Sequence, residues 1–400
     1  MLGVSLSFSL FLSQANAAAM SWMVPEHKYD PDQKRFLDSA SGGENYWVSG
    51  FAGSGKSVLI LATLIRAKHD NPNLKACIVL YTRSLIDLIR AGIPDEIGDV
   101  SVKTYYQFRR DNRKYDLILV DEVQDLPEKD LRQICSQCDQ LIVAGDDDQS
   151  IYDDRVDSDS IPEITRSERF SLTRLHRLPP NVVELAKEIF PDKNLEVGKQ
   201  TRMASVQPRI GEAETDSEEI EYVWEKARQF GQPGSPAAIL IPSHSEIVSF
   251  ANSVLRHEGQ PTWKVELNRY KKNDYASMNQ HLQQTGIKLR YLGSRYGSLR
   301  EAESEGRVFL MTYHSVKGLD FEAVFIPGLS EHLTIWKGDS ERARTLFYVA
   351  LTRSRRDLYL TYTGRPHRFL QRFPEGAVHK VSIPEPVDEE NDDPFGDISF

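Results

Sequence analysis

Cysteine is scarce in this sequence, with three residues in 400, so a fold held together by disulfides is excluded. Two of the three, Cys135 and Cys138, have the C-x-x-C spacing, but no second pair and no histidine lies nearby. We therefore expect no metal or redox site there. Beyond the first twenty residues no apolar run is long enough to cross a bilayer, so we expect no membrane-spanning segment.

An excess of basic residues is also missing. The chain has 49 Lys and Arg against 59 Asp and Glu, for a formal net charge of -10, which argues against a wholly basic nucleic-acid-binding surface. Seven of the acids, and no base, lie between Glu385 and the end of the sequence. Removing these seven from the total leaves -3, and a body so close to neutral can still carry a basic groove.

Both ends of the sequence differ from the rest. The start, "MLGVSLSFSLFLSQANAAAM", has the apolar run and small residues of a signal peptide but lacks its positively charged beginning. We interpret residues 1–23 as a leader or, by preference, an upstream mis-start, with Met20 or Met23 as the natural beginning. Since a genuine export signal is the less favoured interpretation, we expect a cytoplasmic protein. Residues 384–400 are acidic and poor in apolar residues, so we expect a disordered tail.

Between the ends, short apolar runs alternate with helical patterns, which predicts an α/β fold with parallel sheets. The helix "KSVLILATLIRAKHD" follows the first such run. Consecutive prolines at 179 and 180 indicate a boundary. We expect one domain over residues 24–178 and a second over residues 179–383. The expected strands are "NYWVSG", "ACIVLYT", "YDLILVDE", "QLIVAGD", "PAAILIPS", "RVFLMTY", "AVFIPGL" and "DLYLTYT".

The stretch "GFAGSGKS" matches the phosphate-binding pattern G-x-x-x-x-G-K-[ST] in full, between an expected strand and an expected helix. Its glycines let backbone N–H groups face the phosphates, and the start of the helix adds a partial positive charge. Lys56 is placed to reach the β- and γ-phosphates, and Ser57 to coordinate Mg²⁺. The candidate ATP-binding residues are Gly50, Ala52, Gly53, Ser54, Gly55, Lys56 and Ser57.

Acidic residues follow two of the expected strands. In "LILVDEVQD", Asp121 stands where an enzyme with this loop holds Mg²⁺, and Glu122 is placed to activate water. The second group, "VAGDDDQSIYDDR", has five aspartates in thirteen residues. It could be a metal cage or a nucleotide-sensing loop, and the resemblance described next favours the loop.

In order along the chain, these and further strings resemble the motifs of superfamily 1 helicases of the UvrD/Rep/PcrA type. The resemblance runs from Gln33 to Thr363. The strings that carry it are "DPDQKRFL", "GFAGSGKS", "LYTRSL", "VKTYYQF", "DEVQD", "GDDDQSIY", "LTRLHR", "MTYHSVKGLDFEAVFIPG" and "ERARTLFYVALTRSR".

The resemblance implies two RecA-like P-loop domains with ATP and Mg²⁺ between them. Hydrolysis would drive movement along single-stranded DNA, or alternatively RNA, usually 3′ to 5′ in this branch. It implies that Gln149 senses the γ-phosphate and that Arg177 and Arg353 stabilise charge that develops there. Further nucleotide contacts are implied for Gln33, His176, Gly318 and Asp320. Strand contacts are implied for Thr82, Thr104, Tyr105, Tyr152 and His314.

Three departures from the family pattern bear on function. Asp154 replaces the tryptophan on which a base stacks, an interaction worth roughly 1–3 kcal/mol. Val58 and His176 replace the arginine and tyrosine of the adenine site. The inserted accessory domains of larger relatives do not fit in this length, so translocation is more plausible than processive unwinding without a partner.

Two regions suggest further contacts. Bases and tyrosines interleave between Trp263 and Arg300, which is typical either of a nucleic-acid-binding surface or of a solvated face. The tail "VDEENDDPFGDISF" resembles the tip of single-stranded-DNA-binding proteins. It could recruit a partner of that kind, fold back on a basic groove, or be a plain disordered end.

The leading hypothesis is thus an ATP-driven single-strand translocase or helicase. The alternative is an ATPase switch subunit of a larger complex, in which nucleic acid triggers hydrolysis without unwinding. A regulator that binds nucleotide without hydrolysing it is a third possibility, and the retained Asp121, Glu122, Gln149, Arg177 and Arg353 argue against it.

Overall fold

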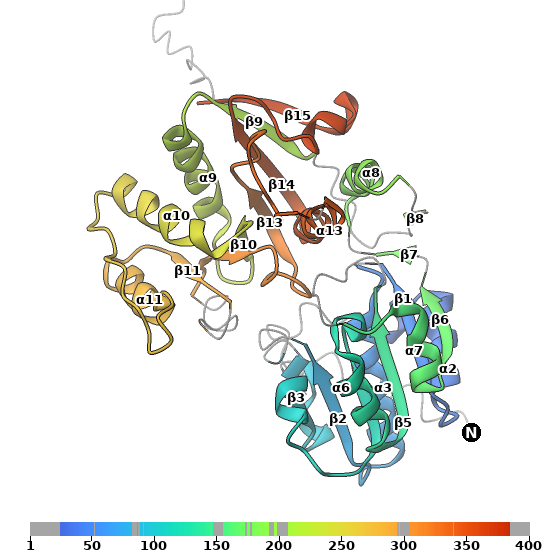
Figure 1. Ribbon diagram of the computed structural model, residues 1–400. Helices are drawn as coiled ribbons and strands as arrows, with labels where there is room; N and C mark the ends of the chain where they lie inside the picture. The colour runs from blue at the N-terminus through green and yellow to red at the C-terminus, as the bar shows by residue number, and fades with distance from the viewer. Residues whose placement is uncertain are drawn as a thin grey trace, which may run out of the picture.

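The computed structural model has two lobes, each built on a parallel sheet with helices packed against it (Figure 1). The residues that the structure describes are 25–51, 53–81, 86, 89–90, 92–146, 155–172, 174–176, 178–191, 196–197, 207–293, 296, 305–338 and 340–384.

The first lobe contains a six-stranded sheet in which every strand pairing is parallel. Strands β4, β5 and β1 are neighbours, so their carboxyl ends, where the candidate nucleotide-binding residues begin, share one edge of the sheet. The strands in spatial order are β3 (Ser101–Thr104), β2 (Ala76–Leu80), β4 (Tyr115–Val120), β5 (Cys138–Gly145), β1 (Tyr46–Gly50) and β6 (Glu168–Leu172).

The helices of this lobe follow from local sequence signals. The helix expected over residues 56–70 is confirmed, and it begins directly after Gly55, whose φ of 93° suits a residue without a side chain. Asp30 caps the first long helix and forms a capping box with Gln33. The helices are α2 (Pro31–Ala40), α3 (Lys56–Asp70), α5 (Tyr105–Phe108), α6 (Glu128–Cys135) and α7 (Ile161–Thr165).

The second lobe contains a seven-stranded sheet that is also parallel throughout. Its strands in spatial order are β11 (Leu289–Tyr291), β12 (Val308–Thr312), β10 (Ala237–Ile241), β13 (Phe321–Ile326), β14 (Ser354–Thr363), β9 (Arg209–Ala213) and β15 (His379–Ile383). Its helices are α9 (Asp216–Phe230), α10 (His244–His257), α11 (Tyr275–Gln284) and α13 (Ser340–Leu351).

Helix α8 (Pro180–Ile189) begins at the second of the two prolines and packs beside α13. Phe190 meets Tyr348 edge to face at 5.1 Å, and Arg344 lies over the Phe190 ring. The remaining short elements are a two-stranded ribbon, β7 (Arg174–Leu175) with β8 (Glu196–Val197), and the 3₁₀ turns η1 (Glu26–Lys28), η2 (Asp95–Ile97), η3 (Val123–Asp125), η5 (Ser158–Ser160), η6 (Leu370–Arg372) and η7 (Glu375–Ala377).

One buried apolar cluster joins the two lobes. It includes Leu59 of α3, Val183 of α8, Phe309 of β12 and Phe347 of α13, all fully buried. Burial of apolar surface is the main force that holds such elements together, so both lobes share part of one core.

The predicted fold class, two parallel-sheet α/β domains consistent with the RecA-like type, is confirmed. The eight strands expected from apolar runs are all present, and the sequence did not indicate the edge strands β3, β6, β11 and β15 or their neighbour β9. The domain limits stay predictions. No helix in the described part of the chain has the length and apolar character needed to cross a membrane.

Candidate nucleotide and nucleic-acid site

The Gly-rich loop joins β1 to α3. Gly53 and Gly55 have φ angles of 78° and 93°, a region that favours glycine. The Lys56 ammonium donates to the carbonyl oxygens of Gly50, at 2.7 Å, and Phe51, at 3.0 Å, which holds it inside the turn of the loop. Ser54 Oγ is buried and finds no hydrogen-bond partner among the described residues. The loop thus combines a confined cation with an unsatisfied hydroxyl, as an anion-binding loop requires.

Gln33 and His176, predicted as nucleotide contacts, lie together beside this loop. Gln33 Nε2 donates to the carbonyl oxygen of Ser54 at 3.3 Å. The backbone N–H of His176 donates to the carbonyl oxygen of Gly53 at 3.0 Å. Asp30 connects the two, because it caps the helix that carries Gln33 and its Oδ2 lies 2.6 Å from His176 Nε2. The sequence had given no reason to name Asp30.

Ser57 and Asp121, the predicted Mg²⁺ ligands, are in direct contact. Ser57 Oγ donates to Asp121 Oδ2 at 2.6 Å. Burial and the neighbouring charge of Glu122 raise the pKa of Asp121 to about 6, against the opposing effect of the Ser57 hydrogen bond. A buried carboxylate with a raised pKa is stabilised by a cation, and hydroxyl and carboxylate oxygens are suitable ligands for Mg²⁺. The pair therefore fits that ion.

The described residues include no group of three or more His, Cys, Asp or Glu side chains placed to hold a metal. Mg²⁺ that binds together with phosphates needs only one or two protein ligands, so Ser57 and Asp121 suffice.

The pKa of Glu122 is shifted in the opposite direction to that of Asp121. Although burial alone would raise the pKa of Glu122, the charges of Lys317 and Lys56 and a hydrogen bond from Gln124 lower it overall. Its backbone has a φ of 57°, the left-handed region, which a residue with a side chain occupies at an energetic cost. The neighbours of Glu122 therefore favour its charged form, and its backbone conformation fixes the carboxylate next to the Ser57–Asp121 pair.

Gln124 links the ends of β4 and β5. Its Nε2 donates to Glu122 Oε2 at 2.6 Å, and its Oε1 accepts from the backbone N–H of Asp146 at 3.1 Å. Gly145 packs so closely on this amide that a Cβ there would collide with it. Asp146, directly after β5, is thus linked through Gln124 to Glu122.

Lys317 brings a cation from the second lobe to these acids. Its ammonium lies 2.5 Å from Asp125 Oδ2 and 3.5 Å from Glu122 Oε2, and its side chain is 2% exposed. Burial alone would lower the pKa of Lys317, but the carboxylates of Asp125 and Glu122 raise it. The sequence reading missed both Lys317 and Asp125, although each lies within a string that carried the resemblance. A basic residue between His314 and Gly318 was the available signal.

Arg353 is the second cation from that lobe. It is buried, its Nε donates to the carbonyl oxygen of Val349 at 2.8 Å, and its Nη1 lies 3.8 Å from Asp320 Oδ1. Its charge also lowers the pKa of Glu122. Gly318, in the same loop as Asp320, has a φ of 81°. The predicted residues Gly318, Asp320 and Arg353 therefore belong to one part of the second lobe. Five other predicted residues lie outside the described part of the chain: Ala52, Thr82, Gln149, Tyr152 and Arg177.

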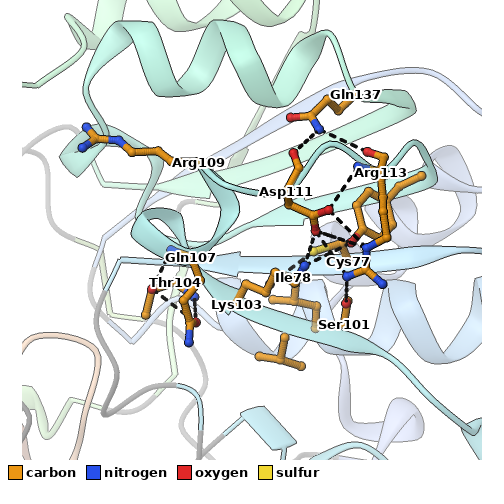
Figure 2. A network of polar contacts seen from close by, with 12 residues as sticks. Cys77, Ile78, Ser101, Lys103, Thr104, Gln107, Arg109, Asp111, Arg113 and Gln137 are labelled. Atoms are coloured by element: carbon orange, nitrogen blue, oxygen red, sulfur yellow. Dashed lines mark hydrogen bonds and ion pairs between the residues drawn. The ribbon is translucent and has the colours of Figure 1, made fainter.

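Thr104 and Tyr105, predicted to touch a nucleic-acid strand, are buried at the start of α5. Thr104 accepts from the backbone N–H of Gln107, whose side chain accepts from the backbone N–H of Thr104 (Figure 2). Tyr105 stacks on Tyr81 at 5.1 Å. The neighbouring Tyr106 is 57% exposed, with Arg109 over its ring, so it is the accessible aromatic side chain of this helix.

A polar network holds this helix in place. Asp111 bonds to Lys103 on β3, Arg113 and Tyr115, while Gln137 donates to the Asp111 carbonyl oxygen (Figure 2). Burial would raise the pKa of Asp111, but these donors hold it well below its usual range. The turn that carries Tyr106 is therefore anchored to the sheet.

His314, the predicted strand contact of the second lobe, lies beside Trp336. The two rings are 5.3 Å apart, and Arg342 covers Trp336 at 3.9 Å. Burial and the positive charge of Arg342 lower the pKa of His314 to about 4, so it is neutral near pH 7. The partly exposed Trp336 was not named from sequence. Each lobe thus offers an accessible aromatic ring paired with an arginine.

Comparisons with known proteins agree with this geometry. Residues 46–221 match the family model of the viral superfamily 1 RNA helicase core domain, and residues 267–365 match that of the UvrD-like helicase C-terminal domain. The ATP-dependent DNA helicase PcrA of Staphylococcus aureus (strain MRSA252) is 39% identical over 108 residues, 22% of this chain. Over these segments the chain is similar to UvrD/PcrA-like helicases of superfamily 1.

Another similar protein is PcrA of Staphylococcus epidermidis (strain RP62A), which is 36% identical over 104 residues and 21% of this chain. The matches span 15% of the S. aureus protein and 14% of the S. epidermidis protein, so the chain matches a small part of either relative. Arterivirus nonstructural protein 10, a helicase, aligns over 82% of this chain and 61% of its own, at 16% identity and a TM-score of 0.37, which is too low to carry an argument.

Proposed function

We propose that this protein hydrolyses ATP with Mg²⁺ and couples hydrolysis to movement along single-stranded DNA, in the 3′ to 5′ direction. Its place would be DNA repair, replication or defence, in the cytoplasm. The observation that carries the proposal is the position of Glu122, which lies at the carboxyl end of β4 beside the Ser57–Asp121 pair and within 3.5 Å of a lysine from the other lobe. Because Glu122 contacts residues of both lobes, a change at this site during hydrolysis can alter how the lobes are placed.

The side chains take distinct parts in this proposal. Ser57 and Asp121 hold Mg²⁺, which neutralises charge on the phosphates. Lys56 and the loop N–H groups bind the phosphates, and Glu122 orients a water molecule and accepts its proton. Lys317 keeps Glu122 ionised. Arg353, together with Gln149 and Arg177, stabilises charge as it develops on the γ-phosphate, while Gln33 and His176 contact the base.

The single strand is proposed to cross both lobes on the side of the aromatic–arginine pairs. Tyr106 with Arg109, and Trp336 with Arg342 and His314, can stack bases and neutralise phosphates. Thr82 and Tyr152 remain candidates, and the buried Thr104 and Tyr105 would act by shaping this surface. Trp336 supplies an indole ring to the proposed strand-binding surface, where Asp154 replaces the base-stacking tryptophan of the family.

The second candidate function is a nucleic-acid-triggered ATPase switch in a larger complex. Asp154 favours it because a base-stacking tryptophan is lost, and the lack of room for accessory domains favours it because those domains help to grip a duplex. A single-strand-binding protein recruited through residues 384–400 is one proposed partner, with RNA as an alternative nucleic acid.

Steady-state ATP hydrolysis, measured with and without single-stranded DNA, tests the proposal, with Lys56→Ala as the inactive control. We expect hydrolysis to rise strongly when DNA is added, and strand displacement would then be assayed. Hydrolysis that responds to neither DNA nor RNA would contradict the translocase and favour the switch. Absence of hydrolysis under every condition would contradict both.

A further inference from the structure

A short antiparallel hairpin projects between α10 and α11 in the second lobe (Figure 1). Its bridge pairs Leu267 with Asn273, and the backbone N–H of Asp274 donates to the carbonyl oxygen of Glu266 at 2.8 Å. At the tip, the Asn268 side chain accepts from the backbone N–H of Tyr270 at 2.9 Å. We call residues 264–274 the hairpin.

Both ends of the hairpin are fixed in the core. Trp263 is buried and exchanges two hydrogen bonds with the Asn252 side chain, at 2.8 and 3.1 Å. Tyr275, at the other end, is buried against Tyr291. The hairpin is therefore a projecting segment whose two ends are anchored in the core. The tyrosines at 275 and 291 are core residues, so the exposed part of the interleaved basic and aromatic stretch includes this hairpin.

The hairpin exposes large apolar side chains. Val265, Leu267 and Tyr270 are 57%, 61% and 63% exposed, and they are three of the four large hydrophobic residues so exposed in the described part of the chain. Isolated exposed apolar residues need no explanation, but three on one anchored hairpin indicate a contact surface. Aliphatic side chains contribute little to binding a phosphate backbone, so this surface fits a peptide better than a nucleic acid.

The same hairpin is strongly basic. Lys264, Arg269, Lys271 and Lys272 are exposed, and none of them forms an ion pair within the described residues. The nearby acids are engaged elsewhere, because Glu266 accepts from Ser277 Oγ at 2.6 Å and Asp274 caps α11. A partner for this surface should therefore be both acidic and apolar.

Residues 385–400 of the same chain have that composition. They contain seven acids, no base, and the apolar residues Val387, Phe395, Ile398 and Phe400. We propose that the last residues of the segment 385–400 dock on the hairpin of their own chain. Asp397 would face its bases, and Phe395, Ile398 and Phe400 would cover Val265, Leu267 and Tyr270, while the preceding acids approach the same basic surface. The docking does not depend on ATP hydrolysis and so stands apart from the proposed function.

The chain is long enough for this contact. Pro384 follows β15, at one edge of the seven-stranded sheet, and the hairpin precedes α11 and β11, at the other edge. Six strand spacings of about 4.8 Å put these edges about 29 Å apart. The 16 residues from Glu385 to Phe400 extend up to about 53 Å, at roughly 3.3 Å per residue.

Photo-cross-linking in the full chain tests the proposal. Tyr270 is replaced by p-benzoylphenylalanine, and cross-linked peptides are mapped by mass spectrometry, with dilution used to separate contacts within one molecule from contacts between two. We expect cross-links from position 270 to residues 385–400 within one molecule. The same replacement at Tyr106, exposed on the other lobe, should give none.

Charge reversal supplies the matched comparison. Arg269→Glu with Lys271→Glu should reduce the cross-link on the order of tenfold, as should about 1 M salt, because both remove the attraction. Lys129→Glu with Arg372→Glu makes the same charge change on exposed residues elsewhere and should leave it intact. Absence of the cross-link, cross-links only between molecules, or cross-links only to added single-stranded DNA would each overturn the proposal.

Discussion

The two lobes have the same architecture but bring opposite charges to the surface where they meet. The first lobe supplies the buried acids Asp121, Glu122 and Asp125, and the second supplies the buried cations Lys317 and Arg353. Buried charges are costly unless they are paired. Glu122 and Asp125 are paired with Lys317 of the opposite lobe, whereas Asp121 is bonded to Ser57 of its own lobe. The candidate nucleotide site is therefore completed by contact between the lobes.

The largest effect should come from removing the charge that the second lobe contributes to hydrolysis. We predict that Arg353→Ala lowers the rate of ATP hydrolysis on the order of a thousandfold or more, because an arginine that stabilises developing phosphate charge contributes that much. ATP binding, measured by fluorescent-nucleotide titration, should change far less. Arg356→Ala, which removes a more exposed arginine of the same lobe, is the control. Equal losses in both variants would refute the assignment.

Substitution of Lys317 tests whether its ion pairs with Asp125 and Glu122 of the other lobe stabilise the fold. Lys317→Met leaves Asp125 and Glu122 without their ammonium partner, so we expect a loss of about 3–5 kcal/mol in the free energy of unfolding, measured with urea. Adding Asp125→Asn should recover part of the loss. Lys337→Met replaces an exposed lysine of the same lobe and should be nearly neutral. A loss below about 1 kcal/mol would mean that the bridge is not a stabilising pair.

The aromatic–arginine pairs extend the comparison to the strand-binding surface. Trp336→Ala should weaken binding of single-stranded DNA by roughly 1–3 kcal/mol, since it removes one stacking platform, and Trp336→Phe should restore most of it. Fluorescence anisotropy with a labelled oligonucleotide measures both. Tyr270→Ala, in the hairpin, should not weaken DNA binding. If Tyr270→Ala weakened binding more than Trp336→Ala, the strand would run over the hairpin instead.

The smallest effect that we predict is a pH dependence of stability caused by His367 in the second lobe. Burial, with a contribution from Arg368, lowers the pKa of His367 to about 4. Because the unfolded chain has the higher pKa, it takes up a proton first, so stability falls as pH drops from about 6.5 towards 4. His367 alone should make the protein roughly 1–2 kcal/mol less stable at pH 5 than at pH 7.

His367→Asn keeps an acceptor for the backbone N–H of Phe369 and should remove that part of the pH dependence of urea unfolding. His332→Asn, on a side chain that is 91% exposed, should leave the dependence unchanged. An unaltered slope in His367→Asn would contradict the assignment.

The sequence predicted much of the fold because buried parallel strands are continuous apolar runs and helices have clear starts. The helix over residues 56–70 and the strands before Asp121 and Asp146 are examples. The edge strand β15, of which one residue in five is fully buried, lacks such a run, and its place next to β9 depends on packing between distant segments.

The site was predictable where it is local and not where it is assembled across lobes. Ser57 and Asp121 each stand in a local motif, and the structure places their side chains in contact, while their role as Mg²⁺ ligands stays a prediction. Asp125 and Lys317 are 192 residues apart in sequence, and no spacing rule connects them. Trp336 was missed because a tryptophan in a loop gives no periodic signal, and Tyr106 because its exposed side is decided by how Tyr105 packs.

The amide at position 124 makes the first lobe intolerant of even the smallest chemical change there. Glutamine offers one donor and one acceptor at the same end of its side chain, and here each faces a group of the matching kind. Glutamate has the same shape but would place a second carboxylate against Glu122. Methionine would leave Glu122 Oε2 and the backbone N–H of Asp146 without these hydrogen bonds. Together with the crowding at Gly145, this makes the two positions interdependent, so a change at either is expected to survive only alongside a change at the other.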